Sequence, residues 1–176
     1  MNIEEKLKLE IRDVVDFPKP GIVFKDITPI MLNPQLSRET VIALKEQVKH
    51  LNITKIAGIE SRGFLFGYPL AMELDLPFVL IRKKGKLPYD KVSQSYALEY
   101  GEATIEMHTD AVNKNDVVLI HDDLLATGGS ASAAAEMISK QGAKIGGFSF
   151  LVSLEFLNGQ EKITPFSENI LTLAHY

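Results

Sequence analysis

The segment VVLIHDDLLATGGSASAAAEMIS, residues 117–139, constrains the fold of this chain more than any other. Its four leading apolar residues, three of them β-branched, come before the carboxylates Asp122 and Asp123, which predicts a strand. The stretch from Leu124 to Gly129 is then expected to connect this strand to an alanine-rich helix. Such a junction gathers free backbone N–H groups at the positive end of a helix dipole, which is an arrangement that holds phosphate.

The side chains of this junction suit a ligand that carries both phosphate and hydroxyl groups. Thr127 and Ser130 add hydroxyl donors, and Gly128 and Gly129 allow the backbone to approach an anion without Cβ clashes. The acidic pair would repel a phosphate, so it needs another partner, either vicinal sugar hydroxyls or a divalent metal. A sugar phosphate meets both requirements. The alternative, a glycine-rich turn beside two solvated acids, does not account for strand, acids, hydroxyls and helix occurring together.

The same segment resembles the 5-phosphoribosyl-1-pyrophosphate (PRPP) loop of the type I phosphoribosyltransferases, and its DDLLATGG run is most similar to the adenine phosphoribosyltransferases. The resemblance implies a single α/β domain, residues 1–176, with a mainly parallel central sheet flanked by helices. It also implies an N-terminal helix and hood in about residues 1–35 and a flexible loop hairpin in about residues 82–107. The residues that it assigns to PRPP and AMP in this loop are Asp122, Asp123, Ala126, Thr127, Gly128, Gly129 and Ser130, with Leu124 assigned to adenine.

The activity that the resemblance implies is that of a glycosyltransferase of the pentosyltransferase class. The 5-phosphoribosyl group of PRPP is transferred to adenine, and the products are AMP and pyrophosphate, in purine salvage. Mg²⁺ is implied as the cofactor, held mainly by PRPP and water because this ion keeps water ligands and favours phosphates. A homodimer is also implied.

Composition sets the outer limits of this interpretation. A chain of 176 residues with 45% hydrophobic and 24% charged residues is typical of one globular domain. It has no cysteine, which excludes disulfides and thiolate metal sites, and it shows no run of about 18 apolar residues. A net charge of −4 does not suit a general polyanion binder. We therefore expect a cytoplasmic protein without nucleic-acid or membrane partners.

The N-terminal region is expected to begin with a helix, since Ile3, Leu7, Ile11 and Val14 or Val15 recur at helical spacing. The following segment, FPKPGIVFKDITPIMLNP, is apolar but contains helix breakers and few signals of regular structure. On its residues alone it is a proline-rich connection packed on the core.

The resemblance assigns this segment instead to a hood over the base. It implies that Phe24 stacks on adenine, while main-chain atoms of Val23 and Lys25 pair with the ring nitrogens and the 6-amino group. The family commonly has arginine where this chain has Lys25. The difference matters little if backbone atoms make the contact, and it matters if a guanidinium fork is required.

A second anion site is predicted at the ESRG turn, residues 60–63, which follows the buried strand KIAGI. A helix is expected from about Phe64 to Leu74 after the turn, and another over residues 38–50 with Ser37 as its N-cap. On its own the ESRG turn is more often an ordinary connection. The resemblance matches it to the family's pyrophosphate loop, with Ser61 binding PRPP and Arg62 gripping phosphate as a catalytic residue.

A strand is predicted at residues 78–81, followed by a basic run and by two strands, SYALEYG and ATIEM, with a turn at Gly101. Such a basic run is usually a solvated hairpin tip. The resemblance places it in the catalytic loop, with Glu99 as the candidate for proton transfer involving adenine. The remaining residues that it assigns to PRPP in this region are Arg82, Lys83, Lys86 and Tyr100. The last strands are expected in AKIGGFSFLVSL and NILTLA.

His121 stands where the family usually has an apolar residue. It is either a general acid or base, or an imidazole satisfied at the end of a strand, and we favour the second because its neighbours already account for the site. His50, His108 and His175 lack the spacing of metal ligands.

Two other functions remain as alternatives. One is a phosphoribosyltransferase for an oxopurine such as xanthine or hypoxanthine. The other is a nucleic-acid regulator that senses PRPP with the same fold, which the acidic charge balance disfavours.

Overall fold

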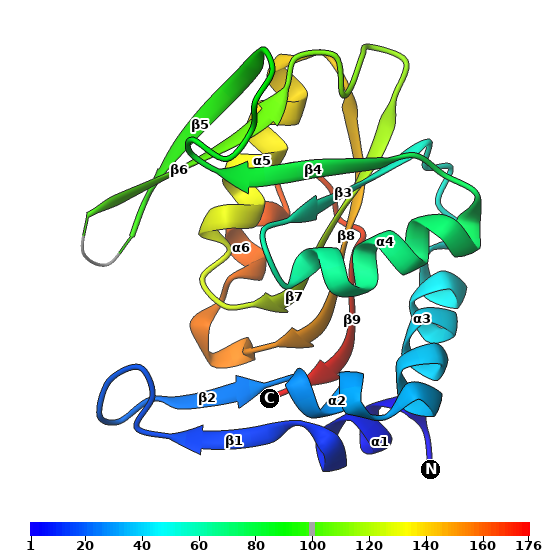
Figure 1. Cartoon of the computed structure of the whole chain (residues 1–176), viewed down its shortest axis with the longest axis vertical. Helices are drawn as coiled ribbons and strands as arrows, with labels where there is room; N and C mark the ends of the chain where they lie inside the picture. The colour runs from blue at the N-terminus through cyan, green and yellow to red at the C-terminus, as the bar shows by residue number, and fades with distance from the viewer. Residues whose placement is uncertain (99–100) are drawn as a thin grey trace.

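A mixed sheet with strand order β5-β6-β4-β3-β7-β8-β9 forms the centre of the computed structural model, which describes residues 1–98 and 101–176 (Figure 1). Strands β3, β4, β7, β8 and β9 run parallel, whereas β6 is antiparallel to both β4 and β5. The prediction of a mainly parallel sheet is therefore confirmed. The strands are β3 (Lys55–Ile59), β4 (Phe78–Lys83), β5 (Lys91–Ala97), β6 (Glu102–His108), β7 (Val117–Leu125), β8 (Lys144–Ser153) and β9 (Ile170–His175).

Helices cover both faces of this sheet, because its central strands are apolar on both sides. In β7 the side chains of Val118 and Ile120 enter one core and that of Leu119 enters the other. The helices α3 (Pro34–Val48) and α4 (Gly63–Leu74) pack on the Leu119 face, and α5 (Gly129–Lys140) packs on the opposite face. None of the described helices is long and apolar enough to cross a membrane.

The N-terminal region differs from the expected long helix. Helix α1 (Ile3–Glu10) begins with a capping box between Asn2 and Glu5, but it ends before Ile11, which is extended. Residues Arg12–Val15 form β1, which pairs antiparallel with β2 (Val23–Asp26) in a separate ribbon. The predicted extension to Val14 or Val15 is wrong, because the next strand, β2, pairs with this segment and overrides its helical spacing.

The segment predicted to be mostly irregular also contains regular structure. It includes β2 and the short helix α2 (Thr28–Leu32), which has Pro29 in its first turn. The next helix, α3, begins at Pro34, and its N-cap is Asn33, whose side chain accepts a hydrogen bond from the Leu36 N–H. The prediction of Ser37 as the cap is therefore wrong, because proline at the first helical position and asparagine before it are the stronger start signal.

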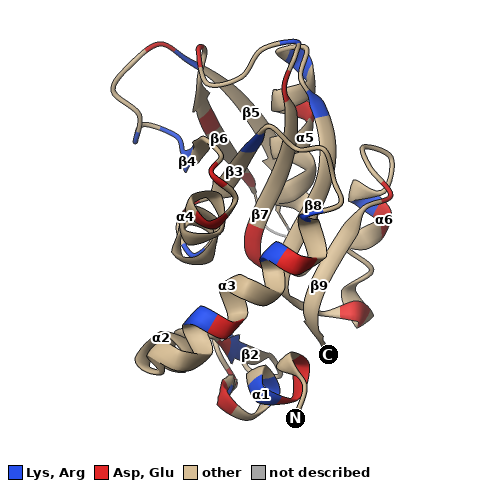
Figure 2. Ribbon diagram, turned by 90° about the vertical axis from the view of Figure 1, so that its right-hand side faces the viewer, with Lys and Arg blue, Asp and Glu red and all other residues tan. Residues whose placement is uncertain are grey.

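Strand β7 continues beyond the acidic pair, so the predicted loop start at Leu124 is also wrong. Its pairing with β8 extends to Leu125, which lies opposite Ser153. The long apolar strand β8 supplies this ladder, and the sequence around Leu124 gives no sign of it. The acidic pair is therefore held in strand geometry, at the end of β7 that lies nearest the ribbon (Figure 2).

The register of the parallel strands brings three connections together. Gly58 of β3 lies opposite His121 of β7, and Ile59 lies opposite Ile81 of β4. The residues after Ile59 and the end of β4 therefore lie beside the acidic pair. Ligands of open α/β sheets bind at this carboxyl edge.

The hairpin β5–β6 is attached to the helix that follows β7. The Gln94 side chain donates a hydrogen bond to Glu136 at 2.9 Å and accepts one from Lys140 at 2.6 Å, and both partners belong to α5. Gly101, at the predicted turn, has a φ of 97°. In Figure 1 the hairpin projects on the side of the sheet toward which β3 and β4 point.

His121 lies in the core between β7 and α4 and is fully buried. Its Nδ1 is 3.2 Å from the Ser149 hydroxyl on β8, and its Nε2 has no hydrogen-bond partner. Burial lowers the pKa of His121 to about 3, so the ring is neutral at physiological pH. The burial agrees with a structural role for His121, but only one of its ring nitrogens is satisfied, so the expectation of a satisfied imidazole holds for Nδ1 and not for Nε2.

His121 should make the fold sensitive to acid. Its pKa is about 6.5 in the unfolded chain and about 3 in the fold, so the unfolded state binds the extra proton as the pH falls below 6.5. The penalty is absent above about pH 7.5 and should reach about 2 kcal/mol at pH 5. Urea unfolding of wild type and His121→Leu, at about pH 7.5 and about pH 5, measures this penalty as the difference in free energy of unfolding. An equal loss of stability in the two proteins would show that His121 does not titrate on unfolding.

Candidate functional site

Two cavities lie at the carboxyl edge of the sheet, on either side of the end of β7. The larger cavity has a volume of about 640 Å³ and is lined by the 126–130 loop, the end of β5 and Leu124. The smaller cavity has a volume of about 310 Å³ and is lined by polar residues only: Glu60, Ser61, Arg62, Lys83, Asp122 and Asp123. Together the two cavities contain most of the side chains that the sequence assigns to PRPP.

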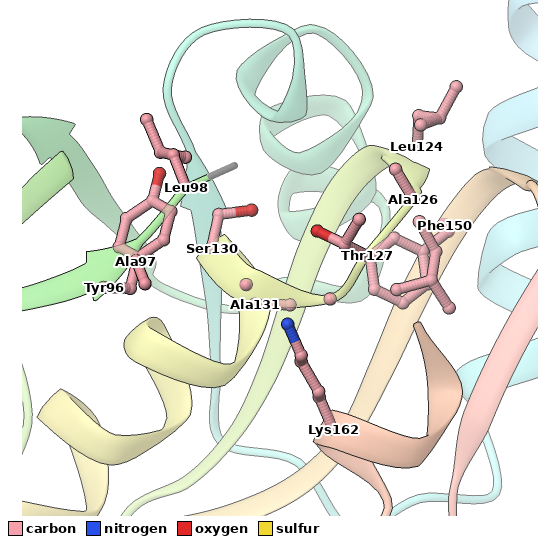
Figure 3. A pocket seen from close by; sticks show the side chains of 13 residues that line it. Tyr96, Ala97, Leu98, Leu124, Ala126, Thr127, Ser130, Ala131, Phe150 and Lys162 are labelled. Carbon is pink, nitrogen blue, oxygen red and sulfur yellow. The ribbon is translucent and has the colours of Figure 1, made fainter. Parts of the chain in front are cut away.

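The 126–130 loop forms one wall of the larger cavity. Gly128 is the N-cap of α5 and has φ 75° and ψ 3°, a left-handed conformation that suits glycine. Figure 3 shows the hydroxyl groups of Thr127 and Ser130 on the same loop, above the first turn of the helix. The predicted residues Leu124, Ala126, Thr127, Gly128, Gly129 and Ser130 all line this cavity.

A backbone contact with a distant segment fixes the shape of this loop. A Cβ atom on Gly159 would lie 2.2 Å from the Ala126 carbonyl oxygen, and one on Gly128 would lie 2.4 Å from the Gly159 oxygen. No side chain fits between the two segments. The 126–130 loop therefore rests directly on the chain that leads into α6 (Gln160–Ile163).

The smaller cavity contains a close ion pair between the two predicted anion sites. Nε of Arg62 lies 2.6 Å from Oδ2 of Asp123, whose side chain is only 5% exposed. The approach lacks hydrogen-bond geometry, so this buried oxygen has no hydrogen-bond donor. This oxygen can accept a hydrogen bond from a ligand hydroxyl, because a buried acceptor without a hydrogen bond is costly.

The neighbouring carboxyl group, Asp122, is in a different state. Burial and the charge of Asp123 raise the pKa of Asp122 well above its usual range, against a smaller opposing effect of Arg62. Its Oδ1 accepts a hydrogen bond from the Asp123 N–H at 2.9 Å and lies against the start of α4, where a Cβ on Gly63 would be 3.0 Å away. The pair can therefore both donate and accept hydrogen bonds.

Glu60, which the sequence analysis did not single out, organises the basic residues. It accepts a hydrogen bond from the Lys83 N–H at 2.8 Å and pairs with Nε of Arg82 at 3.2 Å. Burial alone would raise the pKa of Glu60, but these two partners lower it below its usual value. Arg82 is thereby turned away from the smaller cavity, and its Nη1 bonds the Lys86 carbonyl at 3.3 Å. Among the predicted basic side chains, Arg62 and Lys83 line that cavity and Arg82 and Lys86 do not.

The ribbon β1–β2 reaches this site through Phe24. The Arg62 guanidinium lies 5.2 Å from the centre of the Phe24 ring, which is also in edge contact with Phe17. Lys25 points elsewhere: its Nζ is 2.6 Å from Asp13 and lies over the Tyr176 ring. Its side chain is therefore engaged within the N-terminal region and with the C-terminus, whereas Val23 is 44% exposed.

Glu99 and Tyr100 lie outside the described residues. His121 lines neither cavity. Residues of the larger cavity that the sequence analysis missed are Tyr96, Ala97, Leu98, Leu125, Ala131, Phe150 and Lys162. Tyr96 belongs to the predicted hairpin, and its ring lies 3.3 Å from the Cβ position of Gly129, so the hairpin was a signal for it. No local motif marks Lys162.

This arrangement, with a glycine-containing phosphate loop and a basic turn flanking two carboxyl groups, is that of a phosphoribosyl transferase. The phosphoribosyl transferase domain family matches residues 31–161. The adenine phosphoribosyltransferase of Cytophaga hutchinsonii is 51% identical over 174 residues, which cover 99% of this chain and 96% of that protein. The chain belongs to the adenine phosphoribosyltransferase family.

Solved structures agree with this assignment. The crystal structure of adenine phosphoribosyltransferase from Thermoanaerobacter pseudethanolicus matches with a TM-score of 0.94 and 41% identity, covering 98% of this chain and 99% of that one. The enzyme from Giardia lamblia, complexed with 9-deazaadenine, matches with a TM-score of 0.93 and 36% identity, covering 100% and 98% of the two chains. The predicted fold class is confirmed.

The contact between Gly128 and Gly159 gives a test of the larger cavity. Gly159 has φ −60° and ψ −24°, which alanine adopts readily, so Gly159→Ala should act only through its clash with Ala126. We expect a loss of about 1–3 kcal/mol in stability and at least about tenfold weaker binding of AMP. Calorimetric titration and urea unfolding measure the two effects. The control is the exposed neighbour Gln160→Ala, which should change neither, and wild-type behaviour of Gly159→Ala would refute the contact's role.

Proposed function

We propose that this chain catalyses transfer of the 5-phosphoribosyl group from PRPP to adenine, giving AMP and pyrophosphate. As a pentosyltransferase of purine salvage, it needs one site for the 5-phosphate, one for the pyrophosphate and a place for the ribose between them. The observation that carries the proposal is the position of Asp122 and Asp123 in the smaller cavity, directly before Leu124 and Leu125 of β7, which line the larger cavity. The 5-phosphate would bind at the 126–130 loop and the pyrophosphate beside Arg62.

The charges in the smaller cavity suit the departure of pyrophosphate from the ribose. Breaking the bond at C1 leaves positive charge on the sugar and negative charge on the leaving group, so both must be stabilised. Arg62 and Lys83 face the position of the leaving group, while Ser61 adds a hydroxyl. The acidic pair would hold the ribose hydroxyls, with Oδ2 of Asp123, which lies beside Arg62 but accepts no hydrogen bond from the protein, as an acceptor.

Mg²⁺ fits this site as a substrate-bound ion. Among the described residues no three carboxylate or imidazole side chains are grouped to hold a metal, and the acidic pair is partly neutralised by Arg62 and by the raised pKa of Asp122. Bound to pyrophosphate oxygens and water near Asp122 and Asp123, the ion would neutralise charge on the leaving group. The chain's contribution would then be to orient the hydroxyls and the phosphates.

The base would lie beneath the ribbon, with Phe24 stacked on it and Leu124 on the side of the larger cavity. Strand β2 pairs with β1 on one side only among the described residues, so alternate residues present main-chain groups to a free edge. Val23 and Lys25 are two residues apart, so their main-chain groups point to the same side of β2. The side chain of Lys25 is hydrogen-bonded to Asp13 and does not point to the base. These features support recognition of adenine by main-chain atoms.

Several assignments remain predictions. They are the proton transfer by Glu99, the closing of Tyr100 over the site, and the contacts of Arg82 and Lys86 with pyrophosphate. A rotation of Arg82 away from Glu60 would be needed before its guanidinium reached the smaller cavity. The cytoplasmic location also remains a prediction.

Neither alternative function is favoured by the structure. A nucleic-acid regulator needs a basic face, whereas Figure 2 shows basic and acidic residues side by side on α1 and α3. An oxopurine would present a carbonyl acceptor and a ring donor where adenine presents a donor and an acceptor. Main-chain groups set for adenine would then be left unpaired, at a cost of about 1–3 kcal/mol for each group.

The proposed function predicts pyrophosphate release from PRPP with adenine, at least about tenfold faster at low base concentration than with hypoxanthine or xanthine. Phe24→Ala should weaken binding of every purine by about tenfold, since it removes only stacking area. Lys25→Met should keep the preference for adenine, because the backbone is unchanged. Steady-state pyrophosphate release with each base measures these effects. Release with hypoxanthine alone would contradict the function, and loss of discrimination in Lys25→Met would contradict the main-chain readout.

We further propose a homodimer that forms over the surface of α3 and α4. An apolar groove of about 380 Å³ between these helices is lined by Val41, Ile42 and Leu65, and Met31 of α2 continues it. Exposed apolar side chains gathered on one face mark protein interfaces. The exposed members of this face are Met31, Leu32, Ile42, Leu65, Tyr68 and Met72.

A charge on this face should dissociate the dimer. Ile42 is 54% exposed, so Ile42→Asp should leave the monomer folded while placing a carboxylate in the proposed interface. Leu9→Asp on α1, where the side chain is 75% exposed, is the matched control. Sedimentation velocity should show a dimer for wild type and the control and a monomer for Ile42→Asp. A wild-type monomer at micromolar concentration would refute the homodimer, and a dimeric Ile42→Asp would refute this interface.

A further inference from the structure

Lys162 occupies a position in the larger cavity that its place in the sequence does not suggest. It belongs to the short helix α6, and its side chain lines the cavity together with the 126–130 loop. Figure 3 shows its ammonium nitrogen directed at that loop, from the side opposite Tyr96 and Leu98. Lys162 follows directly after residue 161, where the match to the phosphoribosyl transferase domain ends.

The backbone around Lys162 is fixed by close contacts. Gly159, three residues earlier, touches Ala126, and the Cβ of Lys162 would be 3.3 Å from a Cβ on Gly128. Ile163, the next residue, is fully buried in the core beneath α5. The stem of Lys162 therefore starts at a set position under the loop, and only its flexible end is free to move.

Within the described part of the chain, the charge of Lys162 has no partner. Across residues 1–98 and 101–176 its ammonium group forms neither an ion pair nor a side-chain hydrogen bond. It is also the one charged side chain among the described residues that line the larger cavity. Its partner is therefore to be sought among the ligands of that cavity.

Among the described residues, a 5-phosphate in this cavity would otherwise meet only neutral donors. The loop offers backbone N–H groups, two hydroxyl groups and the dipole of α5, while Arg62 and Lys83 belong to the smaller cavity. The acidic pair lines the smaller cavity, directly before the β7 residues that line the larger one, and repels the phosphate. A dianion bound near two carboxyl groups gains from a cation on its far side, since charge-assisted hydrogen bonds are stronger than neutral ones.

We propose that Lys162 is a phosphate-binding residue, whose Nζ donates charge-assisted hydrogen bonds to the 5-phosphate of PRPP and of AMP. The inference deepens the proposed function and rests on it for the identity of the ligand. It assigns the charged donor of the phosphate site to a residue 32 positions beyond Ser130. The segment that carries this residue contacts the 126–130 loop through Gly159. Lys162 then contributes to substrate binding but not to bond breaking at C1.

The test compares ligands with and without the phosphate. Lys162→Met keeps the length of the side chain and removes its charge, and Lys144→Met, at the start of β8, is the matched control. Titration calorimetry should show AMP and ribose 5-phosphate bound about ten- to a hundredfold more weakly by Lys162→Met, with adenosine binding changed less than about twofold. Lys162→Arg should recover most of the loss, and Lys144→Met should bind like wild type.

Kinetics give a second readout. Lys162→Met should raise the KM for PRPP by about ten- to a hundredfold and change kcat by less than about threefold, because the phosphate contact is the same in the ground and transition states. Equal weakening of AMP and adenosine would assign Lys162 to loop structure alone, and unchanged binding of all three ligands would also overturn the proposal. A third outcome separates the two proposals. If Lys162→Met weakens only the phosphate-containing ligands but the wild-type protein releases no pyrophosphate with adenine, Lys162 binds phosphate and the proposed function is refuted.

Discussion

The site depends on two adjacent carboxyl groups that are held in strand geometry at the end of β7. Placing both in one poorly hydrated corner is costly, and the structure meets that cost in two different ways. Asp123 lies against the Arg62 guanidinium at 2.6 Å, whereas Asp122 has its pKa raised by burial and by its neighbour. Asp122 therefore tends to hold a proton, whereas Asp123 presents an acceptor oxygen beside the guanidinium. This asymmetry lets the pair bind hydroxyl groups in both directions without carrying its full repulsion toward phosphate.

The parallel sheet and two short supports bring the rest of the site to this pair. The register of β3, β4 and β7 sets Arg62 and Lys83 on one side, and the turn into α5 sets the phosphate loop on the other. The ribbon β1–β2 adds Phe24 above Arg62, and Gly159 supports the loop from below. The matched phosphoribosyl transferase domain begins at residue 31, after the ribbon. On the proposed function, the common domain would hold the sugar phosphate, and the preceding segment would select the base.

The sequence predicted the parts of the site that depend on local signals and missed the parts that depend on contacts between separate segments. The junction from β7 through Gly128 into α5 was predicted because strand, turn and helix signals lie within one short segment. The ribbon was missed, since Arg12–Val15 becomes a strand only by pairing with Val23–Asp26. Lys162 and Glu60 were missed for a similar reason. Lys162 lies in a four-residue helix without a motif, and Glu60 acts through the register of β3 beside β4.

The central claim is that the acidic pair holds the ribose between two separate anion sites. A crystal structure of the complex with AMP and pyrophosphate tests it most directly. We predict that the AMP phosphate lies within about 3 Å of the N–H groups of the 126–130 loop. The ribose hydroxyls should bind Asp122 and Asp123, and pyrophosphate should lie beside Arg62. An AMP phosphate bound beside Arg62, or a ribose that makes no contact with the acidic pair, would contradict it.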